Sequence, residues 1–373
     1  MRILTVNHTI DPVFGGGTAE RTFELSQALV KSGYDCTILT LLEGESPREL
    51  KGGRIVRLPV CKFGLIPKYL FKGIVREVKG ADVVHMMGHW TVLNALVYLT
   101  ARHFRKPYVF CPAGALPIFG RSKFVKYIYN LLIGKSIVRN ASRCIATTEN
   151  EIKHFVSYGV SADQVLLIPN AIKDPIVSDI NGNELSKKLG LHTPNYVLFL
   201  GRLNLIKGPD LLVAAFCNIM AEFPDVDLVM AGPDDGMLSE LKATVKERRA
   251  NDRIHFAGYI GGVEKFQVLK AALVLALPSR QEAMSLVVLE AGCVKTPTVF
   301  TDQCGLDKFA KADCGWMVPV SIEGLELGLK EALVNRESIR KKGERVFEFV
   351  QERYMWSSVV GAYSKMFRDL RES

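Results

Sequence analysis

Short apolar runs, each followed by a polar or glycine-rich loop, recur along the first half of the chain. The first covers Arg2–Val6, and stretches with helical spacing separate most of the later runs. Short buried strands that alternate with helices are typical of a parallel sheet in an α/β protein. The other strands are predicted at Cys36–Thr40, Val83–Met86, Tyr108–Cys111, Cys144–Thr147 and Val165–Ile168.

The same alternation restarts in the second half of the chain. A strand at Tyr196–Leu200 is followed by a helix over Asp210–Glu222. Amphipathic helices are expected from Ile322 to Leu370, at the end of the chain. Further strands are predicted at Leu228–Ala231, at Ile254–Ala257 and in the apolar run Ala271–Leu277.

The two halves are separated by residues 173–195, which combine chain breakers such as Pro175 and Pro194 with one short helix. A chain of 373 residues is longer than one hydrophobic core usually fills, so two domains are expected. We interpret residues 1–172 as one Rossmann-like domain, residues 173–195 as the linker and residues 196–351 as a second Rossmann-like domain.

Two glutamates stand out after the apolar run that ends at Leu277. Glu282 lies in the loop beyond this run, and Glu290 is the one charged residue of a predicted helix from Ser285 to Cys293. Ligands of open α/β sheets bind at the carboxyl ends of strands, and free N–H groups at a helix start favour phosphate. The pair could hold the hydroxyls of a sugar and a ribose. The alternative is one capping glutamate and one ion-paired glutamate in the core.

Two glycine-containing loops follow predicted strands. The loop with Gly16 and Gly17 is expected between the first strand and a helix from about residue 19 to 32. Because glycine has no Cβ atom, the backbone N–H groups of this loop could approach a ligand closely. Its alternative is a flexible turn. Arg202 and Lys207, in the loop after Tyr196–Leu200, are suited to clamp a diphosphate, with two solvated surface cations as the alternative.

The order and spacing of these features resemble the retaining glycosyltransferases of the GT-B fold, and most closely the large group 1 family, family 4. The resemblance depends on Glu282 and Glu290 with seven residues between them, followed by alanine and glycine. It implies two Rossmann-like domains that face across a cleft, with the acceptor on the first domain and a nucleotide sugar on the second. The other matching residues are Gly15 to Gly17, Ile168 to Asn170, Gly201, Arg202, Lys207, Gly208 and Ala231 to Pro233.

The resemblance also implies roles for single residues. Glu282 would hold hydroxyls of the donor sugar, Glu290 the ribose, and Arg202 with Lys207 the diphosphate. The segment 352–373 would cross back to the first domain. Other residues expected at the donor are Gly16, Gly17, Gly201, Gly232, Tyr259 near the base, Ser285 and Leu286.

On the acceptor side, many family members carry a histidine after the strand that matches Tyr108–Cys111. This chain has Pro112, Ala113 and Gly114 there, which suggests an acceptor site shaped by backbone around Gly114. His89, in the loop after Val83–Met86, could reach an acceptor hydroxyl, whereas His85 is expected at the end of that strand.

No metal site or disulfide framework is indicated. The eight cysteines are scattered without a Cys-x-x-Cys pair, and the start of the chain is too soon polar for a signal peptide. We therefore expect a cytoplasmic protein. Asp225 and Asp227 spell a metal motif of the other glycosyltransferase fold, but they precede a predicted strand, so we assign them a structural role.

Positive charge is concentrated in the first domain. Residues 1–172 contain 22 Lys and Arg against 12 Asp and Glu, whereas the whole chain has a net charge of +9. The segments Lys62–Lys79 and Arg121–Arg139 are both basic and apolar. They indicate either a helix on an anionic membrane or an ordinary amphipathic helix with solvated lysines. Nucleic acid is not expected as a partner, because no recognition motif accompanies the charge.

The resemblance thus implies a metal-independent hexosyltransferase that moves a sugar, with retention, from a nucleoside-diphosphate sugar to an acceptor hydroxyl. The acceptor would be a glycan or a lipid-linked glycan in cell-surface polysaccharide or glycolipid assembly. The protein could lie peripherally on the inner face of the membrane through Lys123, Lys126 and Lys135. The donor is a substrate, and no further cofactor is expected. Two alternatives remain open: a nucleotide-sugar 2-epimerase and a non-catalytic sugar-nucleotide binding protein.

Overall fold

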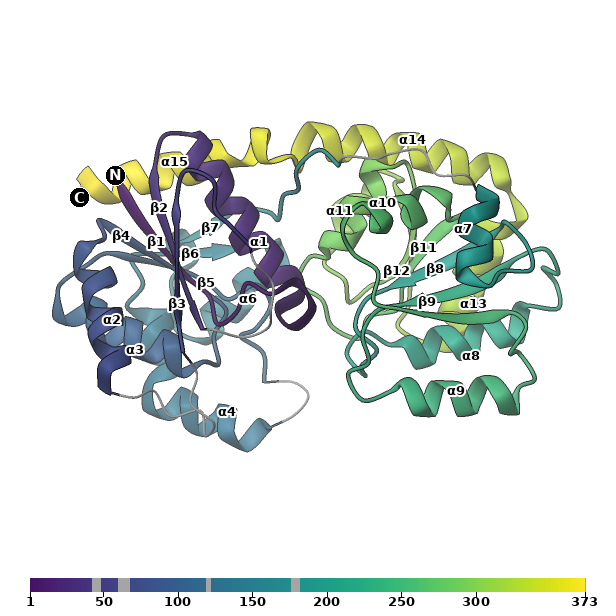
Figure 1. Cartoon of the computed structure of the whole chain (residues 1–373), viewed down its shortest axis with the longest axis horizontal. Helices are drawn as coiled ribbons and strands as arrows, with labels where there is room; N and C mark the ends of the chain where they lie inside the picture. Colours follow the sequence, from purple (N-terminus) through teal and green to yellow (C-terminus); the bar gives the residue numbers. More distant parts are fainter. Residues whose placement is uncertain (42–47, 60–67, 119–121, 176–181, 373) are drawn as a thin grey trace. The chain divides into compact units, whose positions relative to one another are not determined.

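The computed structural model describes residues 1–41, 48–59, 68–118, 122–175 and 182–372. The chain divides into two compact units, one of Met1–Ala171 with Trp356–Ser373 and one of Ile172–Met355. Each unit is built on its own sheet with helices packed against it (Figure 1). This is the pair of Rossmann-like halves that the sequence predicts.

In the described residues the first unit has a seven-stranded parallel sheet, in the order β3-β2-β1-β4-β5-β6-β7. Successive residues of its strands enter different cores, since Ile3 belongs to one apolar cluster and Leu4 to the other. Both faces are therefore covered, as parallel sheets require. The strands are β1 (Arg2–Val6), β2 (Asp35–Leu41), β3 (Arg54–Leu58), β4 (Val83–Met87), β5 (Tyr108–Cys111), β6 (Arg143–Ala146) and β7 (Val165–Leu167).

Helices from both ends of the chain cover one face of this sheet. Leu25 and Leu29 of α1 share a cluster with Val359 and Tyr363 of α15, whereas α2, α3, α5 and α6 supply the other cluster. The helices are α1 (Pro12–Lys31), α2 (Lys68–Gly80), α3 (Val92–His103), α4 (Lys123–Tyr129), the π-helix η1 (Asn130–Gly134), α5 (Lys135–Arg139), α6 (Glu149–Ser157), the short 3₁₀ helix η2 (Ala162–Gln164) and α15 (Trp356–Glu372).

The second unit has, in its described residues, a six-stranded parallel sheet in the order β10-β9-β8-β11-β12-β13. Val197 and Leu198 again belong to different clusters, so this sheet too is buried on both faces. The strands are β8 (Tyr196–Leu200), β9 (Asp227–Ala231), β10 (Ile254–Gly258), β11 (Val274–Leu277), β12 (Thr298–Thr301) and β13 (Gly315–Val318).

Its helices alternate with the strands, as in the first unit. They are α7 (Gly182–Leu189), α8 (Pro209–Ile219), α9 (Leu238–Glu247), α10 (Gly262–Ala271), α11 (Leu286–Cys293), α12 (Asp307–Lys311), α13 (Ile322–Val334) and α14 (Arg336–Arg353). Helix α14 packs beside α11, where the space for a side chain at Gly292 is filled by Val346 and Val350.

Several sequence predictions need correction. The strands β3, β12 and β13 were not predicted. The glycine loop is also different, because Asp11 caps a helix that begins at Pro12 and includes the glycines. Gly16 interrupts this helix with φ 53° and ψ −139°, a conformation that few other residues adopt. The glycines thus form a break within a helix rather than a turn before it.

The described residues of the predicted linker, 173–175 and 182–195, all belong to the second unit. The buried side chain of Leu185 in α7 joins the main cluster of that unit, and Ile172 forms a bridge with Met355. Residues 176–181 of the predicted linker lie outside the described residues, as do Lys62 and Arg121 of the two basic segments.

The final helix contributes buried side chains to the core of the first unit. Tyr363 is fully buried and its hydroxyl accepts a hydrogen bond of 2.7 Å from the guanidinium of Arg21 in α1. The ring of His85 in β4 packs against Tyr363 and Phe367, and neither of its nitrogens has a hydrogen-bond partner among the described residues. Burial, and secondly the charge of Arg21, lower the pKa of His85 from 6.5 to about 3.

This pKa predicts a loss of stability in mild acid. The unfolded chain takes up a proton on His85 near pH 6.5, whereas the folded chain stays neutral until about pH 3, so stability falls as the pH falls through that window. Between pH 7 and pH 5 the contribution of one such histidine is about 2 kcal/mol, at 1.4 kcal/mol for each pKa unit. Urea unfolding of His85→Phe should therefore show a weaker pH dependence than the wild type.

The matched control is His103→Gln, because His103 is exposed at the end of α3. This variant should keep the wild-type pH dependence. An equal pH dependence in His85→Phe and the wild type would show that His85 is not buried in the neutral form.

Candidate active site

The residues predicted for the donor gather where the strand order of the second sheet reverses. This reversal lies between β8 and β11, and the loops after these strands contain Arg202 and Lys207 on one side and Glu282 on the other. In open α/β sheets, ligands bind outside the carboxyl ends of the strands at such a point. The topology therefore brings together residues about 80 positions apart in the sequence.

Two glycines allow the loops to pass each other closely. A Cβ atom on Gly232 would overlap the carbonyl oxygen of Gly201, and one on Gly208 would overlap that of Pro278. Both glycines also have positive φ, of 144° and 67°. The backbone of the loop after β8 is therefore in contact with the loops after β9 and β11, without side chains between them.

Lys207 and Glu282 form an ion pair across these loops. The Lys207 Nζ atom contacts the Glu282 carboxylate, and 24% and 16% of the two side chains remain exposed. The backbone N–H of Glu282 donates to the carbonyl oxygen of Gln303 over 3.0 Å, which fixes the position of this residue. A cation and an anion thus lie side by side beyond the carboxyl ends of β8 and β11, and both side chains are partly exposed.

Arg202 lies in the same loop as Lys207 and is held by Asp235, which follows β9. The distance between Arg202 Nη1 and Asp235 Oδ2 is 3.5 Å, and Asn204 donates to the same carboxylate oxygen over 2.8 Å. Asn204 also accepts a hydrogen bond of 3.0 Å from the backbone N–H of Lys207. Asp235 and Asn204 therefore organise the loop that carries both cations.

Glu290 lies within α11, where it is buried and forms an ion pair of 2.5 Å with Lys265 of α10. Ser285 occupies the position before the first residue of this helix, and its side chain makes no capping hydrogen bond. Leu286 is the first helical residue, and both it and Ser285 are buried. The first-turn N–H groups of α11 follow closely after Glu282 in the chain.

Tyr259 and the glycines complete the set predicted for the donor. Tyr259 follows β10 and is half exposed, while Gly201 and Gly232 lie at the carboxyl ends of β8 and β9. These residues therefore belong to neighbouring strand ends of one sheet. Gly16 and Gly17 belong to α1 of the first unit.

The predicted acceptor residues lie at the carboxyl edge of the first sheet. The backbone N–H of Gly114 donates to Glu151 over 2.5 Å, and the indole of Trp90 donates to the carbonyl oxygen of Ala115 over 2.6 Å. Ala113 and Gly114 both have positive φ. The loop after β5 is therefore a fixed backbone turn held by Glu151.

His89 is placed differently from its prediction. Its ring is 1% exposed, packs against Trp90, Phe110 and Tyr129, and contacts Asn130 Oδ1 through Nε2 at 3.1 Å. Burial lowers the pKa of His89 to about 4. The ring therefore joins η1 to the loop after β4 as a buried group among aromatic side chains, where almost none of it is exposed to solvent.

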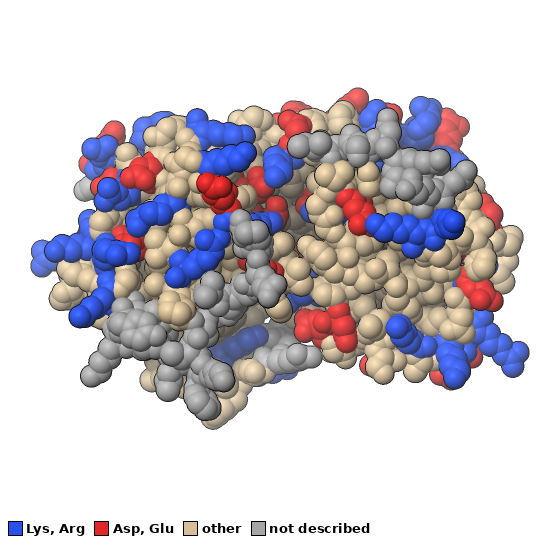
Figure 2. All heavy atoms as spheres, in the orientation of Figure 1, with Lys and Arg blue, Asp and Glu red and all other residues tan. Residues whose placement is uncertain are grey.

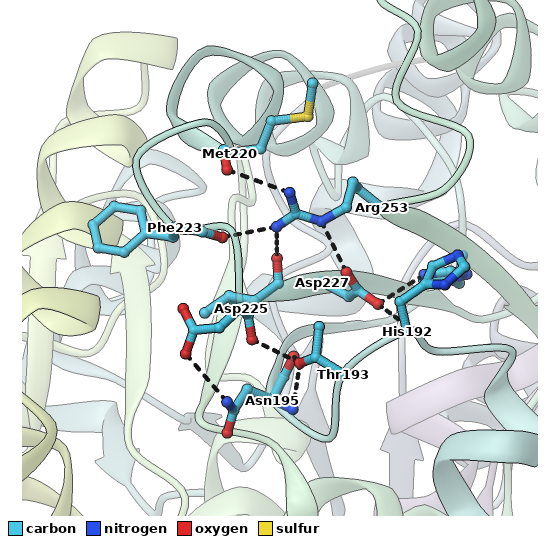
Figure 3. Close-up of polar contacts among 10 residues, drawn as sticks. His192, Thr193, Asn195, Met220, Phe223, Asp225, Asp227 and Arg253 are labelled. Carbon is cyan, nitrogen blue, oxygen red and sulfur yellow. Dashed lines mark hydrogen bonds and ion pairs between the residues drawn. The ribbon is translucent and has the colours of Figure 1, made fainter.

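The two aspartates that resemble a metal motif have structural partners (Figure 3). Asp227 is the first residue of β9, whereas Arg202 and Lys207 follow the last residue of the parallel strand β8, so they lie at opposite ends of the strands. Its carboxylate contacts Arg253 Nε at 3.0 Å and His255 Nε2 at 3.1 Å, and Asp225 contacts Asn195 at 3.3 Å. Among the described residues no group of His, Cys, Asp and Glu is arranged to hold a metal ion.

Arg280, Asp235 and Lys265 contact the predicted site residues or their loops, but the sequence did not identify them. Arg280 lies two residues before Glu282 and forms two hydrogen bonds to the Asp210 carboxylate, of 2.8 and 2.6 Å. It also donates to the carbonyl oxygen of Leu205 over 2.9 Å, and its backbone N–H donates to Ile206. The proximity of Arg280 to Glu282 in the chain was the available signal, but its partners lie about 70 residues away.

Comparison with known proteins agrees with this architecture. The model of the family "Glycosyl transferases group 1" matches residues 182–348, and the model "Glycosyl transferase 4-like domain" matches residues 16–171. Mannosylfructose-phosphate synthase of Agrobacterium fabrum is 30% identical over 46% of this chain, a match that spans only 40% of that relative. D-inositol 3-phosphate glycosyltransferase of Actinosynnema mirum is 26% identical over 85% of this chain and 86% of its own length.

Solved structures show the same fold. Sucrose-phosphate synthase from Thermosynechococcus elongatus matches with a TM-score of 0.79 at 22% identity, over 99% of both chains. Anabaena HepE, solved in complex with UDP and glucose, matches with a TM-score of 0.85 at 16% identity, over 99% of this chain and 100% of that one. The fold is GT-B, with two Rossmann-like halves. The chain belongs to the group 1 glycosyltransferases.

Arg280 should determine how rigid the loop after β8 is. Hydrogen bonds to a charged group are worth roughly 1.5–3 kcal/mol, so Arg280→Ala should speed amide hydrogen exchange of Leu203–Gly208 by tenfold or more. The matched control is Lys341→Ala, which removes an exposed ion pair with Glu337 on α14. Unchanged exchange in Arg280→Ala would mean that the glycine contacts alone hold the loop.

Proposed function

We propose that this protein transfers a glycosyl group from a nucleoside-diphosphate sugar to an acceptor hydroxyl. The observation that carries the proposal is the contact between Lys207 and Glu282 at the point where the strand order reverses. A cation for phosphate and a carboxylate for sugar hydroxyls are the two groups that a nucleotide sugar needs next to each other. The UDP and glucose bound by the structural neighbour HepE support a donor of this class.

In the proposed reaction, the bond between the sugar C1 atom and the diphosphate oxygen breaks, and a bond from C1 to the acceptor oxygen forms on the same face of the ring. The acceptor proton passes to an oxygen of the departing diphosphate. Arg202 and Lys207 stabilise the negative charge that develops there, together with the first N–H groups of α11. Glu282 holds the sugar hydroxyls and Glu290 the ribose.

The ion pairs indicate how the site is kept ready for the donor. Without a ligand, the charges of Lys207 and Glu282 offset each other, so neither is buried alone. When the diphosphate contacts Lys207, the Glu282 carboxylate can accept hydrogen bonds from the sugar. Lys265 offsets the charge of Glu290 in the same way, so a ribose hydroxyl would add to an existing contact.

Two of the described histidines favour a transferase over a 2-epimerase, which needs acid and base groups at the ligand. His85 and His89 are both buried in the core of the first unit. We infer a glycan or lipid-linked glycan as the acceptor, near the backbone turn at Gly114, and a role in polysaccharide or glycolipid assembly at the cytoplasmic face of a membrane. The reaction is proposed to need no metal ion, because the two cations can take the charge of the diphosphate.

Substitutions of the two carboxylates should affect different steps, the transfer rate for Glu282 and the donor affinity for Glu290. Glu282→Gln should lower the transfer rate at least tenfold, because it weakens hydrogen bonds worth roughly 1.5–3 kcal/mol. It should keep the affinity for the nucleoside diphosphate alone, since it removes a negative charge beside Lys207. Glu290→Gln should weaken the donor affinity instead.

The transfer rate is measured by product formation, and the affinities are measured by isothermal titration with UDP, GDP, ADP and dTDP. The matched control is Glu337→Gln, which alters an exposed ion pair on α14 and should behave as the wild type. Wild-type transfer kinetics in both Glu282→Gln and Glu290→Gln would refute the assignment of the site.

The two cations should act on the diphosphate. Arg202→Ala and Lys207→Ala should each weaken nucleoside-diphosphate binding about tenfold and slow turnover, because each removes a charged hydrogen bond. Lys341→Ala is again the control. Transfer by the wild type should persist in EDTA, whereas activity that disappears on chelation and returns with Mg²⁺ or Mn²⁺ would contradict a metal-free clamp.

A further inference from the structure

The helical segment Lys123–Arg139 exposes large apolar side chains on the first unit. Helix α4 buries none of its seven residues, all of which the structure describes. The exposed fractions reach 74% at Phe124, 73% at Leu131 and 75% at Leu132. We call this surface the α4 face; it consists of Phe124, Val125, Tyr127, Ile128, Leu131 and Leu132.

Hydrogen bonds hold the segment that carries the α4 face to the rest of the first unit. Its apolar side chains are therefore not exposed merely because the helix is detached. The Tyr129 hydroxyl donates to the carbonyl oxygens of His89 and Thr91 over 3.0 and 3.1 Å. The Asn130 amide donates to the Tyr158 hydroxyl over 2.6 Å. Ile137 and Val138 of α5 are buried. Single exposed apolar residues are normal on the surface of a soluble protein. A group of six on one firmly held segment instead marks an interaction surface.

Basic residues accompany the α4 face. Lys123, Lys135 and Arg139 are exposed within the segment, and the sequence contains no Asp or Glu between Asp82 and Glu149. Lysine and arginine side chains are also spread over the part of the first unit that faces the viewer in Figure 2. Apolar side chains next to lysines, without acidic residues, are complementary to an anionic lipid surface.

We propose that the α4 face docks into the headgroup region of an anionic lipid bilayer. The apolar side chains enter the boundary between headgroups and acyl chains, while Lys123, Lys135 and Arg139 contact the phosphates. The association is peripheral. Of the described helices, none combines the length and the apolar content needed to cross a bilayer.

The docked surface is joined directly to the loops of the proposed acceptor site. Tyr129 bonds to the loop after β4, and Trp90 of that loop donates to Ala115, next to Gly114. A bilayer at the α4 face would therefore lie close to the turn at Gly114. A lipid-linked acceptor fits this placement, and this last step alone rests on the proposed function.

The test is flotation of the full chain with vesicles of phosphatidylcholine, with or without phosphatidylglycerol, at low and high salt. We expect binding to the anionic vesicles at least tenfold stronger than to the neutral ones, and weakened by salt. The double variant Leu131→Ser with Leu132→Ser should lose binding tenfold or more, and so should Lys123→Gln with Lys135→Gln. Thermal unfolding should be unchanged, because all four side chains are exposed.

Matched control variants lie on α13 and α14 of the second unit. Leu327→Ser with Val334→Ser removes two exposed apolar residues, and Lys330→Gln with Lys341→Gln removes two lysines. Both should bind anionic vesicles as the wild type does. Flotation needs no donor, so its result is independent of the transferase assay.

Three outcomes would overturn the proposal. They are absent binding, equal binding to neutral and anionic vesicles, and unchanged binding of both α4-face variants. A second copy of the chain is the competing occupant. A dimer in analytical ultracentrifugation that dissociates in the Leu131→Ser, Leu132→Ser variant, without vesicle binding by the wild type, would assign the surface to that copy.

Discussion

The candidate site of the second unit depends on backbone segments that pass each other without room for a side chain. Gly208 meets Pro278 and Gly232 meets Gly201, so the loops after β8, β9 and β11 behave as one layer. Because the loops are this close, the Lys207 ammonium can reach the Glu282 carboxylate. The parallel sheet places all three loops at the same end of the strands, and the glycines allow their backbones to come into contact.

Electrostatic pairing explains how so many charges can gather in one partly buried site. Arg202 is paired with Asp235, Lys207 with Glu282 and Lys265 with Glu290. A buried charge without a partner would cost several kcal/mol, so the pairs allow the folded chain to keep groups that a charged ligand needs. The same pairing limits their freedom, because a ligand must compete with, or add to, an existing contact. Arg280 belongs to this arrangement through the loop that it fixes and through Asp210.

The first unit buries two histidines and exposes a group of large apolar side chains. His85 and His89 are buried, whereas Phe124, Leu131 and Leu132 are exposed. His89 and Tyr129 connect the two, since they tie the helix that carries the exposed residues to the end of β4. The chemistry expected of a loop histidine is thus replaced by a structural role, and the surface gains an apolar face next to basic residues.

The sequence by itself determined the repeated strands and helices, and the resemblance to known motifs identified both the fold and the family. The strands at Tyr108–Cys111 and Tyr196–Leu200 were predicted to the residue, because short apolar runs bounded by breakers have few alternatives. Only the tertiary structure decided that Glu290 pairs with Lys265, that Arg280 fixes the loop of Lys207, and that His89 is buried. These facts depend on contacts between residues distant in the chain. Periodicity reports whether a side chain faces a core, but it does not report which partner lies there.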